Sequence, residues 1–297
     1  METGTIPLST VPGGFDLQST LESGQTFRWR RDDGQTYDEP VAYGGDAWYA
    51  SVVDGEVVRV RQVDDRLEWE STTDATPILR RQLRLDDDLD AILDAVPDDP
   101  LLDRAVDAFP GMHIVNDPFF PTLVSFICSA QMRVERIHRM QVDLAETYGD
   151  PVELDGRTYY GYPTPDRLAA ATEADLRDLR LGYRAPYVKQ SAELLASGEV
   201  TPEDVAGLPY EEAREALTAF VGVGDKVADC VLLFSLGYLE AVPLDTWIQQ
   251  AIAEHYPDCD RGGYAETSRA IRERFGGRHA GYVQTYVFHY LRTGGTA

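Results

Sequence analysis

Lys226 and Asp245 are the residues whose types and spacing most directly suggest chemistry. The chain has 27 basic residues, of which 25 are arginines, and Lys189 is the one other lysine. Burial beside apolar groups lowers the pKa of an amine, and the neutral amine is a nucleophile. Asp245 follows nineteen residues later in the segment AVPLDTW, and a carboxylate opposite such an amine can stabilise positive charge.

Both residues also have purely structural interpretations. Asp245 follows a proline at the start of a predicted helix, where an aspartate is a common N-cap. The structural interpretation of Lys226 is a solvated lysine near a helix start, although the positive end of the helix dipole makes a lysine slightly unfavourable there. Because this chain uses arginine almost everywhere else, the presence of a lysine at position 226 favours the catalytic interpretation of Lys226. For Asp245, spacing alone leaves both the catalytic and the N-cap interpretation open.

The segment around Lys226 predicts two helices joined by a tight turn. The helix YEEAREALTAF (210–220) ends at the turn VGVG, which contains Gly222 and Gly224, and Asp225 lies where the N-cap of the next helix belongs. Glycines permit close approach of another chain, and the N–H groups at a helix start can bind phosphate without sequence preference. About half of such turns between helices are plain connections that bind no other chain.

The elements around this hairpin predict an α+β protein. Alternating residues predict strands at 26–30, 57–63 and 67–70, with turns at 32–34, 44–46 and 54–55. Helical spacing follows at 89–96, 121–148, 165–179, 186–197, 225–236, 245–255 and 281–291. We therefore expect a small antiparallel β-sheet domain (1–82) packed on a larger all-helical domain (83–297).

Composition narrows the classes of function. No apolar run approaches the roughly 20 residues of a membrane span, and METGTIPLST does not resemble a secretion signal. We therefore expect a cytoplasmic protein. Three cysteines are too few for a four-cysteine iron–sulfur cluster, and the five histidines lack the spacing of a zinc site.

The net charge of −24 ordinarily argues against binding to nucleic acid. The excess of arginine over lysine and acidic runs such as Asp86–Asp88 are, however, typical of proteins from salt-loving organisms. At about 1 M salt the Debye length is about 3 Å, so repulsion from DNA is largely screened. The charge therefore does not exclude a nucleic-acid enzyme.

The sequence LTAFVGVGDKVADCVLLFSL followed by AVPLDTW resembles the helix–hairpin–helix (HhH-GPD) glycosylase superfamily, specifically its 8-oxoguanine DNA glycosylase branch. Further segments agree in the same order along the chain: SGQTFRW (23–29), SFICS (125–129), LGYRAPY (181–187) and Ala280-Gly281-Tyr282 with Gln284 and Phe288. The resemblance covers nearly the whole chain, and the hairpin it implies spans about 211–236.

The resemblance implies a role for each pocket residue. Lys226 is the expected nucleophile and Asp245 the essential carboxylate. Phe288 and Cys230 are expected to sandwich an everted base and Gln284 to read its Watson–Crick edge. The remaining pocket positions are Gly24, whose carbonyl would accept the N7–H of 8-oxoguanine, and Trp247, which replaces a histidine of the animal pattern.

The resemblance also implies a DNA interface. Tyr183 is the expected intercalating residue, and Arg136 and Arg184 are expected to contact the estranged cytosine. Gln131 takes a place where the animal pattern has an asparagine run, which leaves the preference for cytosine open. The remaining expected contacts are the hairpin glycines Gly222 and Gly224 and a structural cation at the backbone carbonyls of Thr218, Phe220 and Val223.

These features together predict a bifunctional DNA glycosylase/AP lyase that excises oxidised purine from duplex DNA in base excision repair. We expect a monomer without a required cofactor or membrane partner, associated with the nucleoid of a halophilic prokaryote. Two alternatives are an alkylpurine glycosylase of the same fold that uses water, and a non-catalytic DNA-binding protein. Lys226 and the Gly24 segment count against the first, and Asp245 counts against the second.

Overall fold

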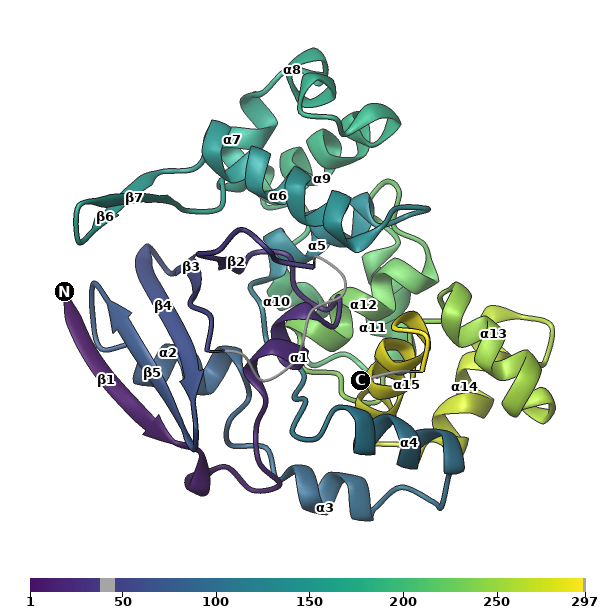
Figure 1. The fold of residues 1–297 in the computed structure, drawn as a ribbon. Helices are drawn as coiled ribbons and strands as arrows, with labels where there is room; N and C mark the ends of the chain where they lie inside the picture. Colours follow the sequence, from purple (N-terminus) through teal and green to yellow (C-terminus); the bar gives the residue numbers. More distant parts are fainter. Residues whose placement is uncertain (38–45, 296–297) are drawn as a thin grey trace.

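A computed structural model, which describes residues 1–37 and 46–295, has an antiparallel sheet at one side and a helical majority (Figure 1). The expected α+β class with an N-terminal antiparallel sheet is therefore confirmed. The five strands lie in the order β1 (Glu2–Pro7), β5 (Arg66–Ser71), β4 (Glu56–Val63), β3 (Tyr49–Val53) and β2 (Arg30–Arg31).

The register of β4 against β5 explains why this sequence forms a sheet. Val60 lies opposite Trp69 on the buried face, while Arg59 lies opposite Glu70 and Arg61 opposite Glu68 on the other face. The Arg61–Glu68 ion pair measures 2.7 Å, and Arg59 pairs with Glu70. A slip of one residue would bury the charged face, so the alternation fixes the register.

The helices extend along the chain from α1, between the first two strands, to α15 near the C-terminus. Their bounds are α1 (Leu17–Glu22), α2 (Thr76–Gln82), α3 (Leu89–Asp94), α4 (Pro100–Ala108), α5 (Phe119–Cys128), α6 (Val134–Tyr148), α7 (Pro165–Ala170), α8 (Glu173–Asp178), α9 (Ala185–Ser197), α10 (Pro202–Val205), α11 (Tyr210–Leu217), α12 (Asp225–Ser235), α13 (Thr246–His255), α14 (Tyr264–Arg274) and α15 (Ala280–Arg292). No helix among the described residues is long and apolar enough to cross a membrane.

Several predicted elements differ from the structure. The predicted helix 121–148 is interrupted at residues 129–133, where Gln131 has a φ of 54°, and the predicted helix 165–179 is interrupted after Ala170. The predicted all-helical part also contains a hairpin of β6 (Pro151–Leu154) and β7 (Arg157–Tyr160). The expected turn at 44–46 includes residues outside the described ranges, and the domain boundary after residue 82 stays a prediction.

The segment Thr26–Arg30 was predicted as a strand, and only Arg30 lies in one. The Thr26 hydroxyl donates to Asp117 Oδ2 at 2.5 Å, and Arg28 donates to the Val52 carbonyl at 2.7 Å. The alternating polar side chains of this segment therefore make hydrogen bonds to distant parts of the chain, and most of the segment forms no β-sheet hydrogen bonds.

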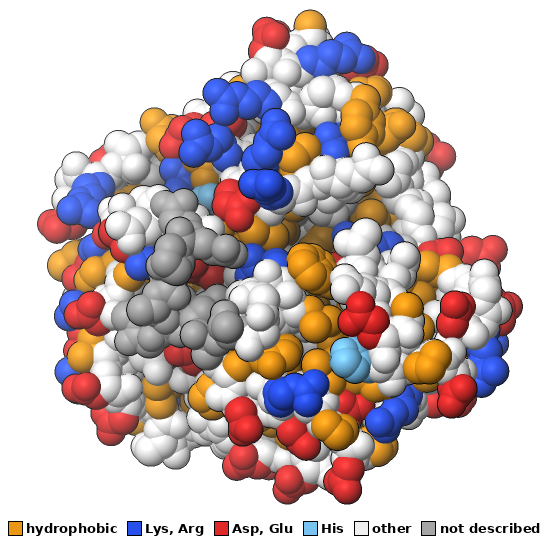
Figure 2. All heavy atoms as spheres, turned by 45° about the vertical axis from the view of Figure 1, so that its right-hand side comes forward, with side chains coloured by type: hydrophobic (Ala, Val, Ile, Leu, Met, Phe, Trp, Pro, Cys, Tyr) orange, Lys and Arg blue, Asp and Glu red, His pale blue; other side chains and the backbone are white. Residues whose placement is uncertain are grey.

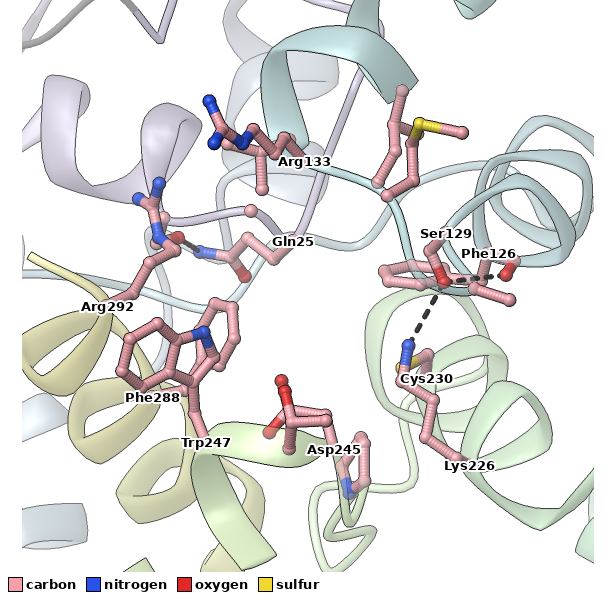
Figure 3. A pocket seen from close by; sticks show the side chains of 18 of the residues that line it. Gln25, Phe126, Ser129, Arg133, Lys226, Cys230, Asp245, Trp247, Phe288 and Arg292 are labelled. Atoms are coloured by element: carbon pink, nitrogen blue, oxygen red, sulfur yellow. Dashed lines mark hydrogen bonds between the residues drawn. The ribbon is translucent and has the colours of Figure 1, made fainter. Parts of the chain in front are cut away.

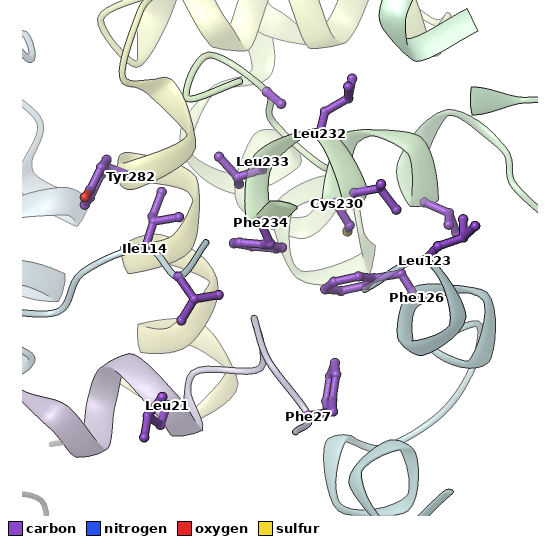
Figure 4. Packing of buried hydrophobic residues seen from close by; sticks show 14 of the residues in the cluster. Leu21, Phe27, Ile114, Leu123, Phe126, Cys230, Leu232, Leu233, Phe234 and Tyr282 are labelled. Atoms are coloured by element: carbon purple, nitrogen blue, oxygen red, sulfur yellow. The ribbon is translucent and has the colours of Figure 1, made fainter. Parts of the chain in front are cut away.

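Gln25 joins this segment to the chain that leads into α5. Its amide nitrogen donates to the carbonyls of Thr20 and His113, both at 2.8 Å, and its amide oxygen accepts from Val115 N–H at 2.8 Å. Apolar packing makes the same connection, because Leu21 and Phe27 belong to one core with Phe126 and other helical residues (Figure 4). The sheet side and the helical side are thus one packed body.

We expect Gln25→Ala to destabilise the protein by roughly 3 kcal/mol or more, because several buried backbone groups lose their partners at about 1–3 kcal/mol each. Urea unfolding followed by circular dichroism measures this change. Gln35→Ala is the matched control, because the side chain of Gln35 is exposed. Equal stability of the two variants would contradict the role given to Gln25.

Candidate active site

A cavity of about 790 Å³ lies between the segment after α1, the loop from α5 to α6, and helices α12, α13 and α15. Figure 3 shows side chains from these elements converging on it. The structure brings together eight of the residues expected at the site: Gly24, Gln131, Lys226, Cys230, Asp245, Trp247, Gln284 and Phe288 all line the cavity.

Lys226 lies in the first turn of α12 and is partly buried. Its Nζ donates to Ser129 Oγ at 3.0 Å and lies 5.6 Å from the centroid of the Phe126 ring (Figure 3). The Ser129 hydroxyl in turn donates to the Phe126 carbonyl at 2.7 Å, so its lone pairs are directed to the lysine. The amine is thus held inside the cavity by a neutral hydroxyl and an aromatic face.

Asp245 is both a helix cap and a cavity residue. Its Oδ1 accepts from Ile248 N–H at 2.8 Å as the N-cap of α13, and Figure 3 shows the carboxylate pointing into the cavity. Burial raises the pKa of Asp245, while the Ile248 N–H and the charge of Lys226 act in the opposite direction. The two interpretations left open by the sequence are therefore compatible, because the cap fixes the orientation of the carboxylate.

Gly24 and Phe288 form one wall of the cavity. Gly24 has a φ of 92°, and a Cβ there would lie 3.3 Å from Phe288 Cε1 and 3.4 Å from Val134 Cγ1. A side chain at this position would therefore be strained and would push against the ring. Cys230 contributes another wall, and burial raises the pKa of its thiol to about 12, so the sulfur is neutral and apolar.

The polar part of the cavity includes Gln284 and the edge of Trp247. Gln284 is buried on α15, and its Oε1 lies 3.2 Å from the Thr285 hydroxyl, which also donates to the Gly281 carbonyl at 2.8 Å. The Trp247 side chain is 37% exposed on α13. Arg133 and Arg292 also line the cavity, and the sequence analysis did not single them out.

The residues expected at the DNA interface are divided by the structure. Tyr183 is 57% exposed, whereas Arg184 is buried beneath it with its Cζ 4.3 Å from the Tyr183 centroid. The Arg184 guanidinium donates to the carbonyl of Ala130, which ties Tyr183 to the loop between α5 and α6. Arg136 is exposed on α6 and lies outside the cavity lining.

The hairpin between α11 and α12 requires glycine at one position. Gly222 has a φ of 86°, and a Cβ there would lie 2.6 Å from Tyr187 Cδ2. Gly224 has open space around it and is the N-cap of α12, so the expected cap at Asp225 is wrong because Asp225 is already the first helical residue.

The hairpin carbonyls give no direct sign of the expected cation. The Phe220 carbonyl accepts from Val223 N–H at 3.1 Å, and Thr218 caps the end of α11. Among residues 1–37 and 46–295, no group of three or more histidines, cysteines, aspartates or glutamates is arranged to hold a metal ion. A cation at the carbonyls of Thr218, Phe220 and Val223 stays a prediction.

Asp229 is a residue that the sequence analysis missed. It is fully buried one turn after Lys226, and it accepts from the hydroxyls of Tyr210 and Tyr264, each at 2.7 Å. The Tyr264 oxygen also accepts a hydrogen bond at 3.1 Å from the backbone N–H of Leu244, which is the residue before Asp245. An aspartate on the apolar face of the predicted helix was the available signal, since buried carboxylates need partners.

Comparisons with known proteins give two adjoining family matches. Residues 6–123 match the family described as 8-oxoguanine DNA glycosylase, N-terminal domain, and residues 124–276 match the family described as HhH-GPD superfamily base excision DNA repair protein.

Individual relatives match over most of their lengths. A probable N-glycosylase/DNA lyase of Methanothermobacter thermautotrophicus is 29% identical over 95% of both chains. An N-glycosylase/DNA lyase of Saccharomyces cerevisiae is 31% identical over 81% of this chain and 68% of its own. The structure of Clostridium acetobutylicum 8-oxoguanine glycosylase/lyase with double-stranded DNA containing cytosine opposite 8-oxoG superimposes with a TM-score of 0.83 and 30% identity, covering 94% of this chain and 92% of that chain.

Burial raises the pKa of Asp229 to about 7, although the two tyrosine hydroxyls and Arg214 act in the opposite direction. Between the ordinary pKa of 3.8 and about 7, the folded chain therefore holds a proton that the unfolded chain has lost. The free energy of unfolding falls as pH rises through this window, by at most about 1.4 kcal/mol per pH unit. Asp229→Asn should remove this decline.

The measurement is the free energy of unfolding in urea, taken for the unaltered protein and the variant at several pH values across the window. The difference between the two proteins should change with pH inside the window and level off above it. Asp258→Asn, at an exposed aspartate, is the control. A constant difference at all pH values would mean that Asp229 is ionised throughout.

Proposed function

The chain belongs to the HhH-GPD superfamily of base excision DNA repair proteins, in the branch with the 8-oxoguanine DNA glycosylase N-terminal domain, and from this we propose how its cavity works. The resemblance seen in the sequence motifs is confirmed. The protein is an 8-oxoguanine N-glycosylase/DNA lyase of base excision repair. The roles of its residues are our proposal.

One observation carries the proposal: an amine and a carboxylate from the N-terminal ends of two successive helices line the same cavity. Lys226 lies in the first turn of α12 and Asp245 caps α13. The cavity volume of about 790 Å³ lies in the range of about 300–1,000 Å³ common for ligand sites. An enzyme that acts on a base in duplex DNA must evert the nucleotide into such a pocket.

In the proposed reaction the neutral amine of Lys226 attacks C1′ of the everted nucleoside. The bond from C1′ to N9 of the base breaks, its electrons leave with the base, and the base takes up a proton. Opening of the sugar ring gives a Schiff base between Nζ and C1′. Loss of a proton from C2′ then expels the 3′ phosphate, which is β-elimination and nicks the strand.

Asp245 is proposed to stabilise the positive charge that develops on the sugar and to accept a proton. Burial raises the pKa of Asp245 above its ordinary value, which favours proton uptake, and its N-cap hydrogen bond holds the carboxylate in one orientation. The Ser129 hydroxyl, which accepts from Nζ, aims the amine before attack.

Base recognition is assigned to the cavity walls. Phe288 and Cys230 would hold the everted base between an aromatic face and a neutral sulfur, and Gln284 would hydrogen-bond its Watson–Crick edge. The Gly24 carbonyl would accept the N7–H of 8-oxoguanine. Guanine presents an acceptor at N7 instead, and two facing acceptors leave each other unpaired, which costs about 1–3 kcal/mol.

DNA binding is assigned to the rim. Exposed Tyr183 is proposed to enter the base stack, and Gly222 and Gly224 to bring backbone N–H groups to a phosphate, aided by a cation at the hairpin carbonyls. Gln131 and Arg136 would face the opposite base. Arg184 would join them only after leaving the Ala130 carbonyl.

The remaining details of the proposal are a monomer in the cytoplasm, associated with the nucleoid of a prokaryote, that requires no cofactor. The monomer is supported by a cavity that one chain completes. Of the two alternatives, a water-using alkylpurine glycosylase is disfavoured because Lys226 occupies the cavity, and a purely DNA-binding role because Asp245 faces the same space.

Borohydride should trap a covalent adduct between the protein and a duplex that contains 8-oxoguanine, because reduction converts the Schiff base into a stable amine. We expect Lys226→Gln to abolish the adduct, and Asp245→Asn to slow base release by at least about 100-fold, the order lost with one electrostatic stabiliser. Gel electrophoresis of labelled DNA measures both.

Lys189→Gln is the matched control, since Lys189 is the other lysine and its Nζ donates to the carbonyls of Ala169 and Ala171. This variant should form the adduct normally. Base release without any adduct would support the water-using alternative, and absence of release would support the DNA-binding alternative.

Excision should persist at about 1 M KCl, because salt at this level screens the repulsion between the acidic surface and DNA. A time course of product formation at increasing KCl concentrations tests the expected adaptation to salt. Loss of activity at high salt, with a maximum at about 50 mM, would refute the halophilic interpretation.

A further inference from the structure

Most arginines in this chain are neutralised by a neighbouring carboxylate. Arginines of the sheet, of the region around β6 and β7, and of α14 form ion pairs within 4.0 Å. Examples are Arg157–Asp32, Arg167–Asp150 and Arg269–Glu211. Such pairing makes these arginines poor partners for phosphate. An arginine left unpaired in a chain of net charge −24 is therefore informative.

Arg133, Arg136 and Arg139, here called the arginine track, are exposed and form no ion pair with any described residue. Arg133 directly precedes α6, and the other two lie on its first two turns. Positions three apart are neighbours on a helix surface, so Arg136 and Arg139 lie on the same side of α6, and Arg133 is the residue immediately before its first turn.

The arginine track begins at the cavity. Arg133 lines the cavity, and Figure 3 places it across from Asp245 and Trp247. Figure 2 shows basic side chains gathered above the hollow, whereas acidic ones predominate along the lower edge of the same face. The basic side chains thus lie beside the opening through which DNA would reach Lys226.

Other charges on this half of α6 leave the arginine track positive. Glu135 is the one acidic residue among 133–139, and it is partly buried at the cavity. Burial lowers the pKa of His138 to about 4, so this histidine is neutral. Glu146, near the end of the helix, is occupied by Arg30 at 2.7 Å.

We propose that Arg133 and Arg139, on either side of Arg136, bind phosphates of the duplex next to the everted nucleotide. This inference rests on the proposed function and adds to it two phosphate contacts that the family resemblance does not assign. Phosphate contacts strengthen binding to any sequence because each releases counterions from the DNA. The arginine track would supply a local attraction that the net charge of the protein opposes.

The test is the salt dependence of DNA affinity. The dissociation constant of a labelled duplex is measured by fluorescence anisotropy at increasing KCl, with and without 8-oxoguanine, for Arg133→Gln, Arg139→Gln and the double variant. The logarithm of the affinity falls linearly with the logarithm of the salt concentration, and each lost phosphate contact makes this negative slope shallower by about 0.9. We expect the slope to become shallower by about 0.9 for each single variant and by about 1.8 for the double variant, on both duplexes.

Arg104→Gln is the matched control, because Arg104 is also exposed and unpaired among the described residues but lies on α4, on the far side of the fold from α6 (Figure 1). Its slope should equal that of the unaltered protein. Arg139→Lys keeps the charge and should keep the slope, which separates charge from packing.

Slopes for Arg133→Gln and Arg139→Gln equal to that of Arg104→Gln would overturn the proposal. So would a loss of affinity confined to the damaged duplex, because the arginines would then read a base and not phosphate. Borohydride trapping with the unaltered protein is run in parallel. An adduct with unchanged slopes rejects the arginine track alone, and failure to form the adduct rejects the proposed function.

Discussion

The buried carboxyl of Asp229 connects the helix that carries Lys226 with the turn that carries Asp245. It accepts hydrogen bonds from tyrosines of α11 and α14, and Tyr264 passes the connection to Leu244 N–H. The amine lies in the first turn of α12 and the carboxylate lies at the N-cap of α13, so their separation depends on this buried junction. A polar network inside an apolar core is stabilising only when its members are satisfied, which makes the junction specific.

The N-terminal sheet serves the same cavity from the other side. The sheet itself supplies no cavity side chain, but the segment that links it to α1 supplies Gly24. Gln25, Thr26 and Arg28 fix that segment to the chain before α5. A glycine carbonyl has no side chain to adjust, so its position must come entirely from its neighbours.

The sequence was sufficient for the fold class and for eight of the residues that line the cavity, although Arg133 and Arg292 were not among them. The hairpin glycines, the lysine and the aspartate have local signatures, because turns, caps and the scarcity of lysine are visible along the chain. The motif order then placed distant residues such as Gly24 and Phe288 together, and the structure has both at one wall.

Other features depend on tertiary contacts that no local pattern specifies. The interruption before α6 needs a left-handed conformation at Gln131, which is uncommon for glutamine. The burial of Arg184 depends on the Ala130 carbonyl. The interruption after α7 had a readable signal, because Thr172 and Asp175 form a capping box.

The close approach of the Tyr187 ring to Gly222 links the hairpin to Tyr183. The Tyr187 ring fills the space that a side chain would occupy, and it also meets the Tyr183 ring edge-on at 6.2 Å. Tyr183, the proposed intercalating residue, is therefore connected to the hairpin through the Tyr187 ring. If the hairpin binds a phosphate as proposed, this connection would set the distance along the duplex from that phosphate to the point where Tyr183 inserts, so that the distance would be a property of the protein and not of the DNA sequence.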